Sequence, residues 1–275
     1  MSAYRTRLQA NEIKLRLQPL KRASLFRGET ELAVRIKEIL TTLSEYKSEL
    51  IDKKRFLIGF LNEFYYDIQT YIYDIKPILN LPQGEIEKFC QQKNLSVTEY
   101  YWYSVILPNW LSQKDPKFSY WIEKLIQEEY TGSDEDLIIA ITKTINVRTD
   151  GSASNRYILD FSMATDLLIS HVPSTLEPVF VQLTGTAILR DRQRNPDFLK
   201  KQQKWNHTLS CWGIKRALLV SHDAQVNTSN NLLKLADVML RGCLKSLIYY
   251  LQGRLEVAAT QTKPTFVGSK ALIFR

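Results

Sequence analysis

Two runs of lysine and arginine give this chain of 275 residues the side chains needed to bind a polyanion. The chain carries 37 basic and 29 acidic residues, a formal net charge of +8. One run is opposed by Glu12 alone and the other by Asp191 and Asp197. The runs comprise Arg5, Arg7, Lys14, Arg16, Lys21, Arg22 and Arg27, and Arg190, Arg192, Arg194, Lys200, Lys201 and Lys204. Because clustered cations bind phosphates and release counterions, we expect a nucleic acid as the partner. A solvated basic surface, a membrane surface and an acidic protein partner are the alternatives.

Cysteine and histidine lack the spacing that zinc sites and disulfide frameworks require. The three cysteines are far apart and form no CxxC pair, which predicts three buried thiols. The three histidines form no HExxH motif, which disfavours a zinc enzyme. These six residues are Cys90, Cys211, Cys243, His171, His207 and His222. The chain also lacks the glycine-rich phosphate loops of nucleotide-binding enzymes and the GxSxG elbow of α/β-hydrolases.

The hydropathy pattern gives no sign of a membrane segment or a secretory signal. Mean hydropathy is −0.24, and no apolar run approaches the roughly 18 to 20 residues that a spanning helix needs. The N-terminus has basic residues but no continuous apolar stretch of the kind found in signal peptides. We therefore expect a cytoplasmic protein that does not associate with a membrane.

The first 130 residues predict a basic arm followed by an all-helical region. Residues 1–28 predict the arm, with a helix around residues 11–18. Over residues 29–130, apolar residues recur at three- and four-residue steps, which is the period of amphipathic helices. Ser96 and Glu99 have the spacing of a capping box, so a helix is predicted to begin there.

A dense group of aromatic residues lies within this helical region. Exposed aromatic rings stack on nucleic-acid bases, but rings at helical spacing more often pack between helices. We favour the packing interpretation for Tyr100, Tyr101, Trp102, Tyr103 and Trp110. Asp67 and Asp74, seven residues apart, are interpreted as part of a solvated helix face.

After residue 131 the pattern changes to alternating helices and strands. Helices are predicted at residues 134–147, 195–211 and 230–250, with Gly213 ending the second. A turn is predicted at residues 149–152. Strands are predicted at residues 157–161, 166–170, 179–184 and 214–221, with further short strands at 265–267 and 271–274. The chain is therefore predicted to be an α/β (α+β) protein, with a helical N-terminal region and an α/β core over residues 131–275 that ends in a C-terminal helix.

The order helix, strand, strand, helix, strand over residues 134–222 resembles the PD-(D/E)xK nuclease superfamily, whose core is the restriction-endonuclease-like mixed sheet. In that family an aspartate on one strand binds a metal ion. A second acid, two residues before a lysine on the next strand, completes the site. The resemblance implies Mg²⁺ as cofactor, with Mn²⁺ as a substitute. It also implies a nucleic-acid partner, DNA rather than RNA, and a homodimer or a subunit of a larger complex.

The resemblance assigns site residues, and it also shows two departures from the family pattern. Asp166 matches the first aspartate, Gln182 stands at the second acid and Thr184 at the lysine. Asp166 and Gln182 would be the metal ligands, with Lys204 on the following helix as a helper and Glu135 as an upstream acid. The side chains expected to hold the nucleic-acid backbone are Arg190, Arg192, Arg194, Lys200 and Lys201.

Three functions are compatible with these residues. The first is a metal-dependent DNA endonuclease or another nuclease-fold component of a restriction, defence or mobile-element system. The second is a catalytically inactive subunit of the same fold that binds DNA, RNA or a protein, because a neutral glutamine and threonine replace the acid and the lysine. The third is a protein–protein scaffold that uses the aromatic helices. Asp166 and the strand of Gln182 also have an ordinary structural interpretation, as a turn residue and a buried strand.

Overall fold

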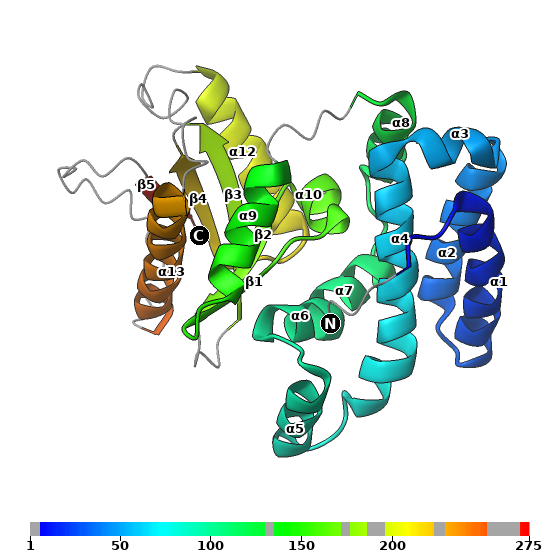
Figure 1. Ribbon diagram of the computed structural model, residues 1–275, viewed down its shortest axis with the longest axis horizontal. Coiled ribbons are helices and arrows are strands. Elements are labelled where there is room, and N and C mark those ends of the chain that lie inside the picture. The colour runs from blue at the N-terminus through cyan, green and yellow to red at the C-terminus, as the bar shows by residue number, and fades with distance from the viewer. Residues whose placement is uncertain are drawn as a thin grey trace. The chain divides into compact units, whose positions relative to one another are not determined.

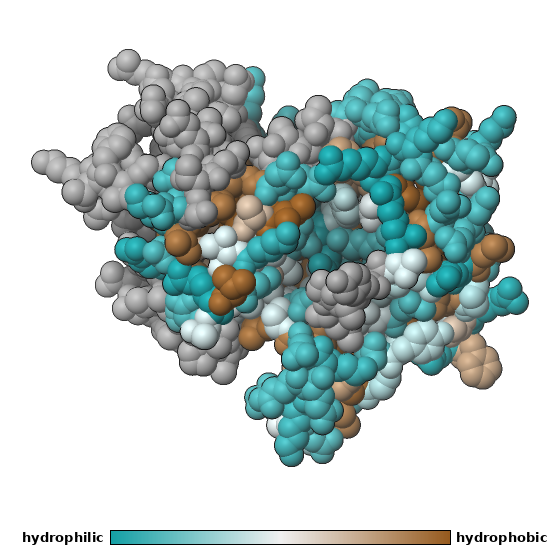
Figure 2. Space-filling model, in the orientation of Figure 1, coloured by the Kyte–Doolittle hydropathy of each residue, from teal (hydrophilic) through white to brown (hydrophobic). Residues whose placement is uncertain are grey.

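The computed structural model describes residues 6–129, 135–171, 177–185, 196–222, 229–251 and 270–274. The chain forms two compact units (Figure 1). The first comprises Met1–Leu95 and Tyr100–Thr131, and the second comprises Ser96–Glu99 and Gly132–Arg275. Hydrophilic residues cover most of the described surface visible in Figure 2, and apolar residues are scattered among them. Within the described ranges, no helix is both long and apolar enough to cross a bilayer.

The described part of the first unit is helical. Its α-helices, together with α6, which straddles the unit boundary, are α1 (Ala10–Phe26), α2 (Thr30–Ser44), α3 (Ser48–Lys53), α4 (Arg55–Thr70), α5 (Gln83–Lys93), α6 (Val97–Tyr101), α7 (Leu107–Ser112) and α8 (Phe118–Gln127). Two π-helical turns, Tyr71–Ile75 and Trp102–Ile106, and a 3-10 turn, Lys76–Ile78, join some of them. The capping box at Ser96 is confirmed, because Ser96 N donates to Glu99 Oε2 at 3.0 Å and Glu99 N donates to Ser96 Oγ at 3.3 Å.

Residues 10–26, within the predicted basic arm, include the helix expected around residues 11–18 and extend it. They form α1, which packs on α2 and α4 and buries Ile13, Leu17 and Leu20. Some bases of this segment make intramolecular bonds: Lys14 Nζ donates to Ser48 Oγ at 3.1 Å, and Arg27 donates to the carbonyl of Ile72 at 3.0 Å. The helix continues past the predicted end at residue 18, with Pro19 inside it.

The aromatic residues of the first unit pack inside it, as the favoured interpretation predicts for three of them. Trp102, Tyr103 and Trp110 are fully buried. Trp110 Nε1 and Trp121 Nε1 both donate to Asp115 Oδ2, at 3.2 and 3.0 Å. Asp115 is itself buried, so its carboxylate satisfies two indole N–H groups that would otherwise be buried without an acceptor.

The second unit is a five-stranded mixed sheet with helices on both faces (Figure 1). The strand order is β1-β2-β3-β4-β5; β3 and β4 are parallel, and the other pairs are antiparallel. Its elements are α9 (Glu135–Asn146), β1 (Gly151–Ser154), α10 (Tyr157–Met163), β2 (Leu167–His171), β3 (Val179–Gly185), α12 (Pro196–Cys211), β4 (Ala217–His222), α13 (Ser229–Leu251) and β5 (Lys270–Phe274).

Most of these elements confirm the sequence prediction, and two contradict it. The predicted strand at residues 157–161 is the helix α10, and the predicted turn at residues 149–152 contains the start of β1. Gly213 ends α12 as predicted, since it adopts a left-handed φ of +66° that glycine accepts without strain. The predicted strand at 271–274 is confirmed as β5, while the one at 265–267 lies outside the described residues.

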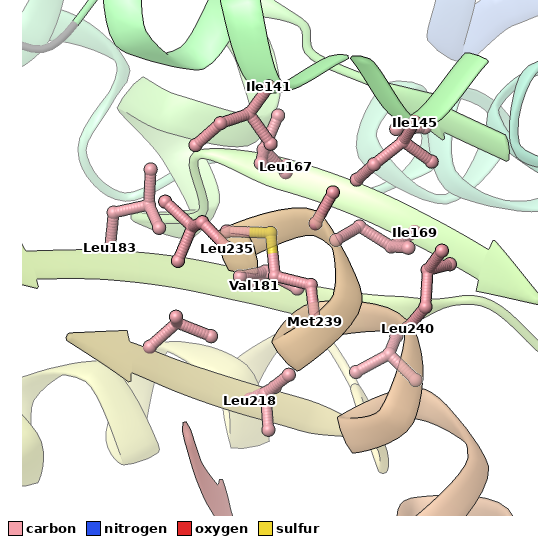
Figure 3. Packing of buried hydrophobic residues seen from close by; sticks show 14 of the residues in the cluster. Ile141, Ile145, Leu167, Ile169, Val181, Leu183, Leu218, Leu235, Met239 and Leu240 are labelled. Atoms are coloured by element: carbon pink, nitrogen blue, oxygen red, sulfur yellow. The ribbon is translucent and has the colours of Figure 1, made fainter. Parts of the chain in front are cut away.

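α9 and α13 cover one face of the sheet, and the core of the unit lies beneath them (Figure 3). Alternate strand residues point into it, as the period of two requires. The residues labelled there are Ile141, Ile145, Leu167, Ile169, Val181, Leu183, Leu218, Leu235, Met239 and Leu240. α10 and α12 lie against the opposite face (Figure 1). Trp212 Nε1 on the α12 side donates to the carbonyl of Ser162 in α10 at 3.2 Å, which joins these two helices.

An ion-pair network connects the loop after α9 to α13. Arg148 binds both carboxylate oxygens of Asp150, at 2.8 and 2.9 Å, and Oδ1 of Asp237 at 2.6 Å. The hydrogen bonds from Arg148 lower the pKa of Asp150 below its ordinary value. The guanidinium therefore fixes where the chain leaves α9 and enters β1.

Candidate functional site

Asp166 lies at the start of β2, next to the part of β3 that carries Gln182. β2 and β3 pair antiparallel with Leu167 opposite Val181, and Asp166 comes just before this first pair. Two hydrogen bonds join Asp166 to β3. Asp166 N donates to the carbonyl of Val181 at 2.9 Å, and Leu183 N donates to Asp166 Oδ2 at 2.5 Å. The second bond fixes the direction of the carboxylate.

The side chain of Gln182 belongs to the sheet face opposite α9 and α13. Val181 and Leu183 are members of the core beneath those helices, and strand residues alternate between faces. Gln182 therefore points to the side of α10 and α12. Its Oε1 is buried and has no hydrogen-bond partner among the residues that the structure describes. Leaving a buried acceptor unpaired costs about 1–3 kcal/mol, so this oxygen is a strong position for a cation or a donor to bind.

The two residues offer the kind of atoms that Mg²⁺ and Mn²⁺ prefer, namely a carboxylate and an amide carbonyl oxygen. They fit such an ion as a two-donor oxygen site. Across the residues that the structure describes, no group of three or more His, Cys, Asp or Glu side chains is placed to hold a metal. The corner formed by Asp166 and Gln182 is therefore poorer in charge than a site with two or three carboxylates.

The structure does not bring the other predicted residues to this corner by a described contact. Thr184 is opposite Ser221 in the parallel ladder of β3 and β4, and its side chain is outside the described residues. Lys204 is exposed on α12, with Trp205 and Thr208 buried beside it. Its ammonium is therefore in solvent, and any action at the corner would require its long side chain to turn inward.

Glu135, the predicted upstream acid, is the first residue of α9. The hydroxyl of Tyr157 donates to its Oε1 at 3.5 Å. Sequence reasoning missed Tyr157 because it assigned residues 157–161 to a strand rather than to α10. A helical reading would have placed Ile158, Leu159 and Ser162 on one buried face.

A row of serines, also missed by the sequence, lies on the same sheet face as Gln182. Ser152 and Ser170 are directly opposite each other in β1 and β2, and Ser154 follows along β1. All three are buried, and their hydroxyls have no hydrogen-bond partner in the described part of the chain. Buried polar groups are normally satisfied. This face is therefore unusually polar for a sheet covered by helices.

The predicted nucleic-acid contacts fall mainly outside the described residues. Arg190, Arg192 and Arg194 lie there entirely, and so does the side chain of Lys201; Lys200 is exposed on α12. The numbers of basic and acidic residues can still be compared for the parts of the sequence before and after Asp166. Residues 1–166 carry 22 bases and 23 acids, and residues 167–275 carry 15 bases and 6 acids. The positive excess therefore belongs to the part of the chain that follows the first site residue.

Comparisons with known proteins do not indicate a family for this chain. No protein-family model, no curated protein and no solved structure matches the chain. The functional argument therefore depends on the residues themselves.

Proposed function

We propose that this protein acts on nucleic acid, most directly as a metal-dependent DNA endonuclease with a restriction-endonuclease-like core. The observation that carries the proposal is the position of Asp166, bonded to β3 one residue past Gln182, together with the Oε1 of Gln182, which is buried and has no partner among the described residues. The order of the elements also supports it. From α9 to β4 the chain forms α9, β1, α10, β2, β3, α12 and β4, with β3 and β4 parallel. This order contains the helix, strand, strand, helix, strand order of the resemblance and adds one strand and one helix to it.

The chemistry at this corner follows from the atoms available. Asp166 contributes one negative charge, and the N–H of Leu183 holds its carboxylate in a fixed direction. Gln182 contributes a neutral oxygen. A divalent cation held there would supply an activated water and stabilise charge on the scissile phosphate. Lys204 would complete the site by turning toward that phosphate, because Thr184 carries no charge. With one carboxylate and one amide, we expect weak cation binding and slow cleavage.

The substrate class follows from charge. Residues 167–275, which follow Asp166 in the sequence, carry 15 bases and 6 acids and are strongly positive. Binding to phosphates through such a segment weakens steeply with salt, because each contact releases counterions. DNA is the substrate class that the resemblance favours, and RNA is the comparison that any assay must include.

The proposal is tested by incubating plasmid, linear duplex and single-stranded substrates, DNA and RNA, with Mg²⁺ or Mn²⁺. Asp166→Asn keeps an acceptor for Leu183 N–H but removes the charge. We expect it to slow cleavage by about 100-fold or more, since metal-ion stabilisation of the transition state contributes several kcal/mol. The matched control is Asp136→Asn, an exposed acid in the first turn of α9, which should cleave at the wild-type rate. Equal cleavage by wild type and Asp166→Asn would show that the site is wrong.

A second function, nucleic-acid binding without cleavage, is favoured by a specific observation. The acid and the lysine of the superfamily pattern are replaced by Gln182 and Thr184, and no three-group metal cluster occurs among the described side chains. Binding that weakens with salt, with no cleavage under either metal, would select this function. Absence of binding to DNA and RNA would select the protein scaffold instead.

A further inference from the structure

The solvent face of α12 carries a histidine and a cysteine beside each other. His207 and Cys211 are one helical turn apart, at positions i and i+4, whose side chains are neighbours on a helix. Both residues are exposed, and Nε2 of His207 lies 3.7 Å from Sγ of Cys211. The helix buries its other face through residues such as Trp205 and Leu209. The pair therefore lies on the side of α12 that does not pack against the rest of the unit.

The separation of these two atoms matches the geometry of a metal that prefers nitrogen and sulfur. Zinc binds histidine nitrogen at about 2.0–2.1 Å and cysteine sulfur at about 2.3 Å, in tetrahedral geometry. Two such ligands on one zinc ion are about 3.6 Å apart. The observed 3.7 Å, which also corresponds to a hydrogen-bond contact between the two side chains, is close to this separation.

We propose that His207 and Cys211 form a two-ligand surface site for a zinc-like transition metal ion. The donors are nitrogen and sulfur, whereas those of Asp166 and Gln182 are oxygen, so the two sites select different metals. The proposal does not depend on nuclease activity. The sequence search for paired cysteines and for HExxH missed this pair, because a mixed His-x-x-x-Cys spacing belongs to neither pattern.

Binding at this site is a ligand exchange without electron transfer. The thiol proton of Cys211 goes to solvent, Sγ and Nε2 each form a bond to the ion, and two of its waters leave. The remaining positions keep water. With two protein ligands, the site should bind more weakly than a closed four-ligand structural zinc site. The positive charge of Lys204, exposed one turn before His207, weakens it further.

The test is a titration of the full chain with Cd²⁺, which reports thiolate binding by an ultraviolet charge-transfer band, followed by displacement with Zn²⁺. We expect the band to saturate at one Cd²⁺ per chain. Cys211→Ser should abolish the band. His207→Gln should weaken the Cd²⁺ affinity by at least about tenfold, because losing even a residue that only supports a metal ligand typically costs about 10-fold or more. The control is Cys90→Ser, which removes a thiol at a half-buried position. This variant should bind Cd²⁺ like the wild type.

Two results would overturn the proposal: a band that persists in Cys211→Ser, or an unchanged affinity in His207→Gln. Cys243 does not confuse the assay, because burial raises the pKa of its thiol to about 12. A second measurement uses the unmodified protein. Zn²⁺ should slow alkylation of Cys211 by iodoacetamide at least about tenfold, read by mass spectrometry, because the bound thiolate is no longer free to react. Alkylation at the same rate with and without Zn²⁺ would also overturn the proposal.

Discussion

Asp67 is a fully buried carboxylate that accepts two hydrogen bonds from aromatic side chains. Trp102 Nε1 donates to its Oδ2 at 3.0 Å, and the hydroxyl of Tyr103 donates to its Oδ1 at 2.8 Å. Asp74, seven residues later, is half-exposed and binds Lys93 Nζ at 3.0 Å. The expectation of one solvated face for both aspartates is wrong for Asp67. The spacing of the two aspartates suggested that the carboxylate of Asp67 is on the surface, but it lies inside the aromatic core.

The two aspartates should therefore differ sharply when each is truncated. Asp67→Ala leaves a buried indole N–H and a buried hydroxyl unpaired, and we expect it to lower the free energy of unfolding by about 3 kcal/mol. Asp74→Ala removes a surface ion pair and should cost less than about 1 kcal/mol. Urea unfolding of the two variants measures the difference, and equal losses would show that Asp67 is not a structural centre.

The sequence predicts the strands of the candidate site but not the contacts of its side chains. The two strands that carry the site could be predicted to within one residue, at 166–170 for β2 and 179–184 for β3. The hydrogen bond from Leu183 N to Asp166 and the unpaired Oε1 of Gln182 could not be predicted. They depend on the exact register of the ladder, and a shift of one residue would move the side chain of Gln182 to the other face.

Among the elements of the second unit, most could be predicted, and β1 and α10 could not. α13 was found because its apolar residues repeat over several turns, and α9 and α12 were found from the signals at their ends. β1 has the sequence GSAS, which carries no hydrophobic alternation, and it is a strand because it pairs with β2. α10 is seven residues long, and its apolar run fits a strand as well as a helix. In both segments, contacts with the rest of the unit determine the secondary structure, rather than the local sequence.

Close packing of α13 on the sheet gives an element-scale prediction. A Cβ atom at Gly242 would lie 2.7 Å from a methyl carbon of Leu218 on β4, a side chain that is fully buried. Gly242→Ala gains up to about 1 kcal/mol of helix propensity but overpacks the core, which typically costs about 1–3 kcal/mol. We expect a net destabilisation of about 1 kcal/mol by thermal or urea unfolding.

Gly84 in α5 is the matched control for this substitution. Nothing lies within 4 Å of the position a Cβ would take there. Gly84→Ala should therefore stabilise the protein, by up to about 1 kcal/mol. The two glycine-to-alanine substitutions should therefore change the free energy of unfolding in opposite directions. A stabilising Gly242→Ala would contradict the described packing of α13 on β4.

On the scale of the whole second unit, the Arg148 network joins the start of the sheet to the last long helix. Arg148→Gln should lower the free energy of unfolding at neutral pH by about 1 kcal/mol, because the ion pairs to Asp150 and Asp237 are partly exposed. Arg241→Gln is the control. Arg241 is exposed and lies 3.9 Å from the same Asp237, so its loss should be within about 0.5 kcal/mol.

The pH dependence of this difference has a defined sign. Arg148 lowers the pKa of Asp150 in the folded state. The stabilisation is therefore fully present above the unfolded pKa, near about 4, and is lost as pH falls through the lower folded value. The gap between wild type and Arg148→Gln should shrink in acid-unfolding measurements below about pH 4. A gap that widens there would exclude Asp150 as the partner that responds to pH.

The distribution of charge is a second feature of the whole molecule. Residues 1–166 are nearly neutral, with 22 bases and 23 acids, although their first 28 residues contain seven bases and one acid. Part of that early cluster is engaged in the first unit, as the bonds of Lys14 and Arg27 show. The segment after Asp166, with 15 bases and 6 acids, is therefore the stronger candidate for nucleic-acid contacts.

The central claim, that Asp166 and Gln182 form a divalent-cation site, is tested most directly by titrating the chain with Mn²⁺ and following the free ion by electron paramagnetic resonance. We expect the wild type to bind one Mn²⁺ at this corner. Asp166→Asn should weaken that binding by at least about tenfold, and Gln182→Glu should strengthen it by a similar factor because it adds a second carboxylate. Asp136→Asn should bind like the wild type. Mn²⁺ affinity that is the same in the wild type, Asp166→Asn and Gln182→Glu would contradict the account.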